Sequence, residues 1–174
     1  MTVARPAGRA QPAKALEFEE FYRSHADRLY RALALTLGDT HLAKEATDEA
    51  TARAYARWPT VSRLENPGGW AYRVGLNWAT SWRRKVRRER PMPPSDPREG
   101  EPATGGSGGV EALRLLAALP VPQRVVIVCR VLLDMSTVET ARLLGVADGT
   151  VKSRLARGLS ALRSTLTEEM DNGR

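Results

Sequence analysis

Residues 135–163 read MSTVETARLLGVADGTVKSRLARGLSALR. Ser136 and Glu139 have the spacing of a capping box, in which the two side chains reciprocally satisfy backbone N–H groups at the start of a helix. The pattern predicts a short helix that ends at Gly145, a turn, and a longer helix that begins near Asp148. Two helices joined by a short glycine-containing turn are typical of a helix-turn-helix, whose second helix enters the major groove of DNA.

The predicted second helix has two faces of different chemistry. Its apolar face, which recurs at helical spacing, consists of Val151, Leu155, Leu159, Leu162 and Leu166. A neighbouring face, which is free to enter a groove, consists of Lys152, Ser153, Ala156, Arg157 and Ser160. Arg154 lies on another flank, where we expect a phosphate contact or a surface ion pair. An ordinary amphipathic hairpin could share the apolar face, but it does not usually combine a capping box, a glycine turn and a basic second helix. DNA binding is therefore favoured.

A break in composition separates this segment from the first half of the chain. Residues 91–109 read PMPPSDPREGEPATGGSGG, and ten of these nineteen residues are proline or glycine. Because such a composition does not form helices or strands, it predicts a flexible linker. We therefore predict an all-α protein with a disordered tail at 1–14, a small helical domain at 15–90 and a second one at 110–170 that contains the helix-turn-helix.

Both predicted domains have helical patterning, and no segment shows the alternation of a strand. Ahead of the helix-turn-helix, the pattern predicts helices over 16–37, 40–58, 67–90, 113–119 and 122–133. Asp39 or Thr40 can cap the second of these helices. Asn66 can cap the third, and Pro67 then stands at the first helical position, where its missing N–H costs no hydrogen bond.

Positive charge is concentrated before the linker. The chain has 27 Lys and Arg against 20 Asp and Glu, and six of the basic residues lie between Arg83 and Arg90. Basic runs bind polyanions because they release counterions from phosphates. A solvated helix end has the same composition, so this run alone leaves both interpretations open.

The sequence offers no pattern of an enzyme site. His25 and His41 are the only histidines, and neither lies in a metal-ligand or triad-like arrangement. No phosphate-binding loop or dinucleotide-binding glycine pattern is present. Glu45, Asp48 and Glu49 on one helix could suggest a metal, but a solvated or partner-facing surface is favoured. We expect no catalytic residue, no cofactor and no metal, and we predict that the protein is not an enzyme.

Two features indicate the compartment. Cys129 is the only cysteine, so no intrachain disulfide can form, which fits a reducing cytoplasm. No apolar run is long enough to cross a bilayer, so membrane insertion is not expected.

The second half of the chain resembles the C-terminal promoter-reading domain of the sigma-70 family, in particular its extracytoplasmic-function (ECF) group. The residues that carry the resemblance are Leu119-Pro120, Gln123-Arg124, Glu139, Ala141, Leu144-Gly145 and Gly149-Thr150-Val151-Lys152-Ser153-Arg154. The resemblance implies that this domain reads the minus-35 element of double-stranded promoter DNA. The contact positions that it implies are Thr150, Lys152, Ser153, Arg154, Ala156 and Arg157.

The first half resembles the other domain of the same family, which engages the minus-10 element and the clamp of RNA polymerase. The matching residues are Asp39, Ala43, Glu49, Ala54, Tyr55, Asn66-Pro67, Trp70, Tyr72-Arg73-Val74 and Asn77. For contact with the melted minus-10 strand, the resemblance implies Arg63, Asn66, Trp70, Arg73, Asn77, Arg84, Lys85, Arg87 and Arg88. For core RNA polymerase it implies Glu45, Asp48, Glu49 and Ala52. An anti-sigma protein is a further candidate partner. The two resemblances together cover residues 16–168 in the family's order.

Aromatic residues of the third predicted helix admit two interpretations. Trp70, Trp78 and Trp82 could stack on unpaired bases, but burial is the commoner role for tryptophans that share a helical face, and we favour it for Trp78 and Trp82. The loop before this helix is where ECF factors hold a flipped base. The candidates there, by position alone, are Arg63, Leu64, Glu65 and Asn66.

The chain departs from the family pattern at Lys44, Ala46, Asp48, Thr51 and Thr140. These departures remove apolar volume and alter the surface that is expected to meet the polymerase clamp, while the fold assignment stands. The competing function is a helix-turn-helix regulator that does not recruit polymerase. Such a regulator would not need the first domain in this form, so a sigma factor is favoured.

Overall fold

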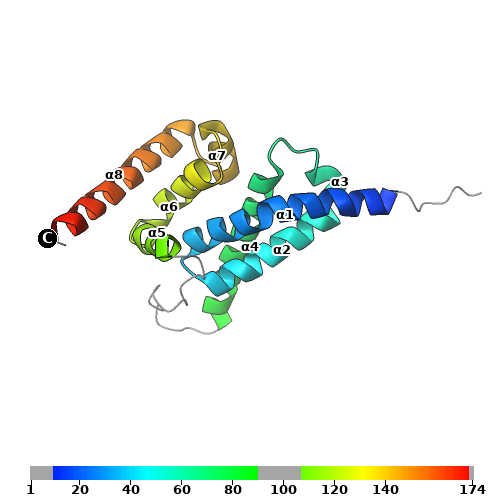
Figure 1. Cartoon of the computed structure of the whole chain (residues 1–174), viewed down its shortest axis with the longest axis horizontal. Helices are drawn as coiled ribbons and strands as arrows, with labels where there is room; N and C mark the ends of the chain where they lie inside the picture. Colours follow the sequence, from blue (N-terminus) through cyan, green and yellow to red (C-terminus); the bar gives the residue numbers. More distant parts are fainter. Residues whose placement is uncertain (1–9, 90–106, 173–174) are drawn as a thin grey trace, which may run out of the picture.

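The computed structural model describes residues 10–89 and 107–172, and every regular element in them is a helix (Figure 1). The elements are α1 (Ala10–Leu37), α2 (Thr40–Ala56), α3 (Trp58–Val61), α4 (Pro67–Glu89), α5 (Ser107–Ala117), α6 (Val121–Ile127), η1 (Val128–Leu132), α7 (Thr137–Leu144) and α8 (Asp148–Asn172). The prediction of an all-α fold is confirmed.

Several boundaries differ from the prediction. The first helix begins at Ala10, so it includes five residues that were expected in the tail. The short helix α3 was missed because Pro59 was taken as a stop, whereas it lies in the first turn of α3, where proline is tolerated. α5 begins at Ser107, inside the predicted linker. The remainder of that linker, up to residue 106, lies outside the described residues.

The first domain packs α1, α2 and α4 around small side chains. Ala46 and Gly75 lie where α2 and α4 cross: a Cβ at Gly75 would stand 2.9 Å from Leu33 Cδ1 and 3.0 Å from the Ala46 carbonyl oxygen. The two helices can therefore approach closely. Two departures from the family pattern, Ala46 and Thr51, are buried in this core, and the close approach of the helices occupies the volume that larger side chains would fill.

A polar pair lies inside this domain. The hydroxyls of Thr36 and Tyr72 are 2.6 Å apart and both residues are buried. Burial raises the pKa of Tyr72 far above its usual value, with a smaller contribution from Cys129 nearby. The pair therefore stays neutral, and it fixes α4 against α1.

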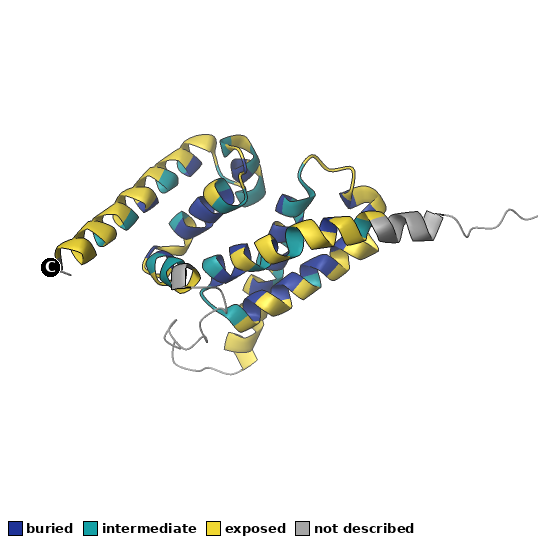
Figure 2. Cartoon of the chain, viewed as in Figure 1, coloured by how far each residue is buried: buried dark blue, intermediate teal, exposed yellow. Residues whose placement is uncertain are grey.

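The second domain surrounds one apolar helix. α6 and η1 form a nearly continuous helix whose last turn widens to π geometry, and Val126, Val128 and Cys129 are buried in it. Burial raises the pKa of the Cys129 thiol to about 12, so this cysteine is protonated and unreactive at neutral pH. The predicted apolar helix over 122–133 is therefore confirmed. α8 packs against α6 and α7 packs against η1, and much of α6 is buried (Figure 2).

The two domains share one continuous hydrophobic core. α1 contacts α5, α6 and η1, and α4 contacts α7. Arg28 donates from Nε to the Leu132 carbonyl at 2.6 Å. The buried Arg124 donates to the Thr36 carbonyl at 3.1 Å and to the Leu119 carbonyl at 3.0 Å. The domains are thus packed side by side in this structure rather than held apart.

Candidate nucleic-acid and protein interfaces

The helix-turn-helix is built from the local signals that predicted it. The Ser136 N–H donates to Glu139 Oε2 at 2.7 Å, and the Glu139 N–H donates to Ser136 Oγ at 3.1 Å. These bonds from Ser136 hold the pKa of Glu139 below its usual value, because they favour the charged carboxylate. Gly145 ends α7 with a φ of 66°, the left-handed conformation that favours glycine. The capping box and the glycine turn are both confirmed.

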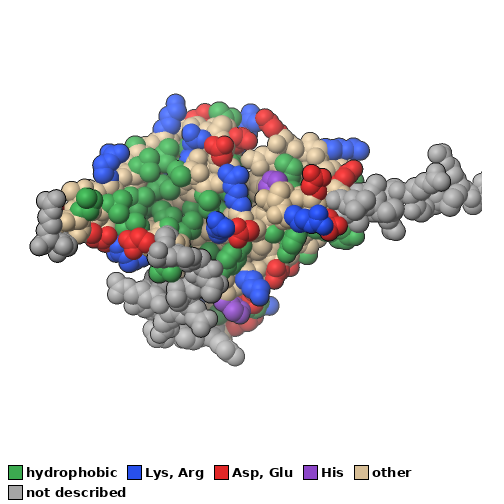
Figure 3. Space-filling model, viewed as in Figure 1, with side chains coloured by type: hydrophobic (Ala, Val, Ile, Leu, Met, Phe, Trp, Pro, Cys, Tyr) green, Lys and Arg blue, Asp and Glu red, His purple; other side chains and the backbone are tan. Residues whose placement is uncertain are grey.

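The buried side of α8 was only partly predicted. Val151 is buried and Leu155 and Leu162 pack against the core, whereas Leu159 and Leu166 are exposed. The sequence analysis was wrong for these two leucines because Gly158, not Leu159, faces the core. A Cβ at this position would stand 2.7 Å from Ile127 Cδ1, so α8 crosses α6 at the glycine. Hydrophobic side chains also gather on the visible face of the molecule in this region (Figure 3).

The opposite side of α8 gathers the residues expected at the minus-35 element. Positions three and four apart share one face of a helix, and the fully exposed members are Lys152, Ser153, Ala156 and Arg157. Thr150 and Arg154 are half-buried at the edges, and the Ser153 hydroxyl donates to the Thr150 carbonyl at 3.1 Å. This face is convex, solvated and basic, as a helix that enters a DNA groove must be.

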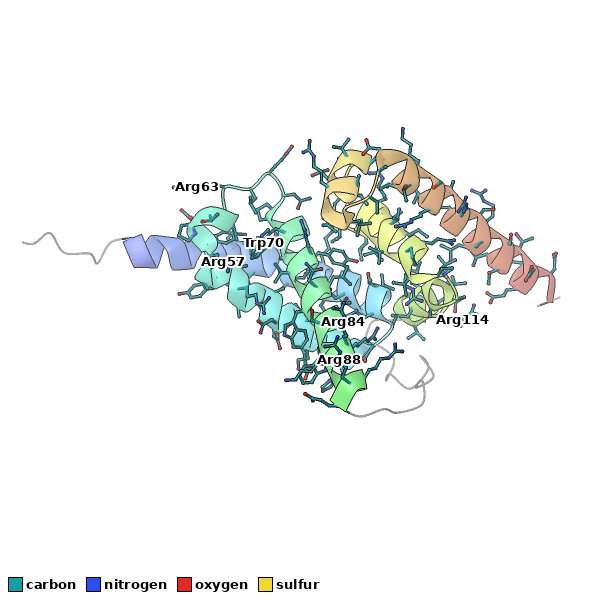
Figure 4. All side chains as sticks on the ribbon, turned by 180° about the vertical axis from the view of Figure 1, so that it is seen from behind. Arg57, Arg63, Trp70, Arg84, Arg88 and Arg114 are labelled. Carbon is teal, nitrogen blue, oxygen red and sulfur yellow. The ribbon has the colours of Figure 1, made fainter. Side chains whose placement is uncertain are left out.

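A second basic stripe runs the length of α4. Its members recur three or four residues apart, on the side opposite the buried Tyr72, Gly75 and Ala79. They are Trp70, Arg73, Asn77, Ser81, Arg84 and Arg88. Trp70, Arg84 and Arg88 follow one another along the helix (Figure 4). The structure thus brings together five of the residues expected at the minus-10 element. Ser81 is exposed on the same side of α4 and was not among the predicted residues, since its side chain carries no charge or ring to mark it.

The other residues expected at the minus-10 element lie around this stripe. Lys85 and Arg87 are exposed on its two flanks, and Arg63 is exposed in the loop after α3. Asn66 caps α4, because its Oδ1 accepts the Gly69 N–H at 2.7 Å, and its amide lies 3.5 Å from the Glu139 carboxylate of α7. Asn66 is therefore committed to structural contacts in this arrangement of the domains.

The residues expected to bind polymerase line one groove. Glu45, Asp48, Glu49 and Ala52 lie on the exposed side of α2, and Trp78 and Trp82 of α4 form the other wall. The predicted burial is wrong for Trp82, which is 44 % exposed, and only half correct for Trp78. The two rings stack with their centroids 5.9 Å apart and their planes at 8°. Sequence alone could not show that they meet α2, because the groove depends on how closely the two helices pack.

Within residues 10–89 and 107–172, no group of three or more His, Cys, Asp or Glu side chains could hold a metal ion. No helix within these ranges is both long enough and apolar enough to cross a membrane.

The fold and these faces define a two-domain DNA-binding protein with a helix-turn-helix. Residues 21–89 match the family model of sigma-70 region 2, and residues 110–162 match that of sigma-70 region 4. The chain is 35 % identical to the RNA polymerase sigma-E factor of Streptomyces coelicolor, over 87 % of this chain and 86 % of that protein. It is 34 % identical to the ECF RNA polymerase sigma factor SigL of Mycobacterium tuberculosis, over 95 % and 97 %. The chain therefore belongs to the sigma-70 family, in its ECF group.

Solved structures share the fold. The sigma factor RpoE of Bartonella quintana, crystallised with the anti-sigma factor NepR, superposes with a TM-score of 0.74 at 21 % identity and covers 87 % of this chain and 97 % of its own. CnrH, in complex with the cytosolic domain of CnrY, superposes with a TM-score of 0.61 at 19 % identity, over 87 % and 88 %. With both sigma-70 regions present, the chain is a factor that recruits RNA polymerase to promoters, and a helix-turn-helix regulator without polymerase recruitment is not supported.

Proposed function

We propose that α8 reads the minus-35 element and that the stripe on α4 engages the minus-10 element, so that this chain directs core RNA polymerase to promoters that carry both. The observation that supports this division is that the exposed members of each set share one side of a helix, away from its buried side. They are Lys152, Ser153, Ala156 and Arg157 on α8, and Arg73, Asn77, Arg84 and Arg88 on α4. Two separate DNA-facing surfaces fit the two separate elements of a promoter.

On α8, Lys152, Ser153 and Arg157 project together and would reach base edges. An arginine can donate two hydrogen bonds to guanine, and this pairing discriminates against the other bases. Thr150 and Ala156 lie beside them, where they would contact a thymine methyl or the sugar-phosphate backbone. Arg154 lies at the edge of the face, where a phosphate contact would hold the helix in register.

On α4, the roles divide along the helix. Trp70, Arg73 and Asn77 lie near its start, beside the loop that holds Arg63 and Asn66, and would hold the melted strand by stacking and hydrogen bonding. The four cations further along would contact phosphates, which position a protein without reading sequence. They are Arg84, Lys85, Arg87 and Arg88.

The exposed side of α2 is the proposed polymerase surface. Glu45, Asp48, Glu49 and Ala52 share one helical face and present three carboxylates to solvent. Such a surface fits a basic segment of the polymerase, because opposite charges steer two proteins together and fix their register.

The remaining assignments complete the proposal. The proposed domains hold α1 to α4 and α5 to α8, and the proposed linker is the part of 91–109 that precedes α5 at Ser107. The chain carries out no catalysis of its own, acts in the bacterial cytoplasm and meets the nucleoid through polymerase. An anti-sigma protein is a proposed partner, because RpoE, which shares this fold, was crystallised with one. Limited proteolysis tests the division, since it should cut first within 91–109; first cuts within 16–89 would contradict it.

Transcription in vitro tests the function directly. Purified bacterial core polymerase, the full chain and a library of promoter fragments from the source genome are combined, and transcripts are mapped by their 5′ ends. We expect transcripts from a restricted set of promoters only when chain and polymerase are both present. Transcription that is independent of the chain, or none at any promoter, would refute the proposed function.

A further inference from the structure

We propose that Trp78 and Trp82 bind an arginine- or lysine-bearing segment of core RNA polymerase, so that the groove between α2 and α4 is one aromatic and acidic docking surface. This inference rests on the proposed role of α2 in polymerase binding. It extends that surface to a second helix, and it removes the two tryptophans from the residues that could stack on DNA bases.

The two tryptophan rings form a stacked pair that is partly exposed. Trp82 is 44 % exposed, and its ring lies nearly parallel to that of Trp78, at 8° and 5.9 Å between centroids. The pair presents aromatic surface to solvent, most of it on the exposed Trp82. Tryptophans that remain exposed in this way are enriched among the residues that contribute most to the affinity of protein interfaces.

Carboxylates of α2 make the surroundings of the rings negative. Glu49 pairs with Arg53 at 2.6 Å and Glu45 lies 3.8 Å from His41. Among the residues that the structure describes, no cationic nitrogen lies within 4.0 Å of the Asp48 carboxylate. The groove therefore keeps a negative wall opposite its aromatic wall.

This combination selects the occupant. A DNA phosphate would be repelled by the carboxylates of α2. A guanidinium or ammonium group is attracted by those carboxylates and by the faces of the indole rings, because a cation over an aromatic ring gains a cation–π interaction. The occupant that fits both walls is a basic protein segment.

Trp78 and Trp82 lie on a different side of α4 from the proposed DNA-facing stripe. Each residue turns an α-helix by about 100°, since 3.6 residues complete a turn. Trp78 and Trp82 directly follow Asn77 and Ser81 of the stripe, so they lie about 100° around α4, toward α2. One helix can therefore contact DNA and polymerase at the same time on adjacent faces.

The test compares two exposed aromatic residues of equal exposure. Trp82→Ala is expected to weaken binding of the full chain to purified core polymerase by about tenfold, as removal of an interface anchor does. Trp82→Phe, which keeps an aromatic face, should recover part of that loss. Tyr22→Ala is the matched control, because Tyr22 is 45 % exposed on α1 and lies outside every proposed interface. Its binding should equal that of the wild type. Fluorescence anisotropy of chains labelled at the N-terminus measures the affinity, and circular dichroism checks that each variant folds.

A photo-cross-linking amino acid in place of Trp82 gives a readout that does not depend on affinity. In the complex with polymerase and labelled promoter DNA, we expect a cross-link to a polymerase subunit. A cross-link to DNA, or wild-type affinity of Trp82→Ala for core polymerase, would overturn the inference. If the wild-type chain itself failed to bind core polymerase, the proposed function would fall with it, and the two failures are thereby distinguished.

Discussion

The two domains contribute different kinds of residue to the hydrophobic core that they share, and their helices pack differently as a result. The first domain buries alanines on α1 and α2, together with Gly75 of α4. The second buries consecutive β-branched residues of α6 and η1, from Val125 to Val128. Small residues bring whole helices together, so side chains of two helices merge into one groove. Around α6 the bulky side chains leave one close approach, where Gly158 of α8 meets Ile127, and the opposite side of α8 is exposed to solvent.

The comparison predicts the largest effect where two helices form one surface. Asp48→Lys combined with Glu49→Lys should weaken binding to core polymerase on the order of 100-fold, about 3 kcal/mol, because like charges then face the basic partner. DNA binding by the second domain, measured by gel shift with the isolated segment 107–174 if it folds and otherwise by footprinting of the full chain, should not change. Unchanged polymerase affinity would remove α2 from the interface.

On α8 the predicted effect is confined to one helix and to sequence preference. Arg157→Ala should cost about 1–3 kcal/mol on the preferred minus-35 sequence and relax the preference there. Neutralising Arg84 and Arg88 on α4 should instead weaken binding to all sequences and flatten its salt dependence, because fewer counterions are released. Titrations on matched and scrambled promoters at several salt concentrations separate the two. Equal losses on both DNAs for Arg157→Ala would mean that α8 is not the reader.

Substitutions of the glycines at the two helix crossings, Gly75 and Gly158, should change the free energy of unfolding to different extents. Gly75→Ala should lower the free energy of unfolding by about 1–2 kcal/mol, since its Cβ would meet a backbone carbonyl that cannot move aside. Gly158→Ala should be nearly neutral: its nearest neighbour is the end of the flexible Ile127 side chain, and alanine gains about 1 kcal/mol of helix propensity over glycine. Urea unfolding measures both. A larger loss at Gly158 would reverse the assignment of the tighter crossing.

The smallest effect concerns two buried hydroxyls. Thr140 Oγ1 is buried with no hydrogen-bond partner among the described residues, so Thr140→Val should stabilise the protein by about 1 kcal/mol. Thr36→Val is the matched control and should destabilise by a similar amount, because the Thr36 hydroxyl pairs with Tyr72. Thermal unfolding would show shifts of opposite sign. A lower melting temperature for Thr140→Val would imply that a water molecule satisfies this hydroxyl.

The features predicted correctly from sequence are those set by residues close together in the chain. The capping box at Ser136, the turn at Gly145 and the basic face around Arg157 depend on residues within one or two helical turns of each other, and the structure contains all three. The cap at Asp39 is confirmed in the same way, through its bond to the Leu42 N–H at 2.9 Å. Such features follow from spacing alone because the backbone of a helix fixes the geometry.

The features predicted wrongly, or not at all, are those that depend on packing between segments far apart in the chain. Leu159 fits an apolar stripe, yet Gly158 takes the buried position, where α8 crosses α6 beside Ile127. Trp82 was expected in the core, yet the narrow space between α2 and α4 leaves its ring outside. The packing of α1 against α5 and α6 was not expected at all, since no periodicity within one helix reports its partner.

Arg124 links the two domains, and this link bears on how they unfold. Its buried guanidinium donates to a carbonyl of the first domain and to two carbonyls of the second. Pulling the domains apart would break the bond from Arg124 to the Thr36 carbonyl and expose the hydrophobic core that the domains share, so heating is expected to melt both domains together. A calorimeter would then record one cooperative heat-absorption peak for the whole chain, whose calorimetric and van't Hoff enthalpies agree. The shared core, with Arg124 and Arg28 bonded across it, would thus make two sequence-separated domains one thermodynamic unit.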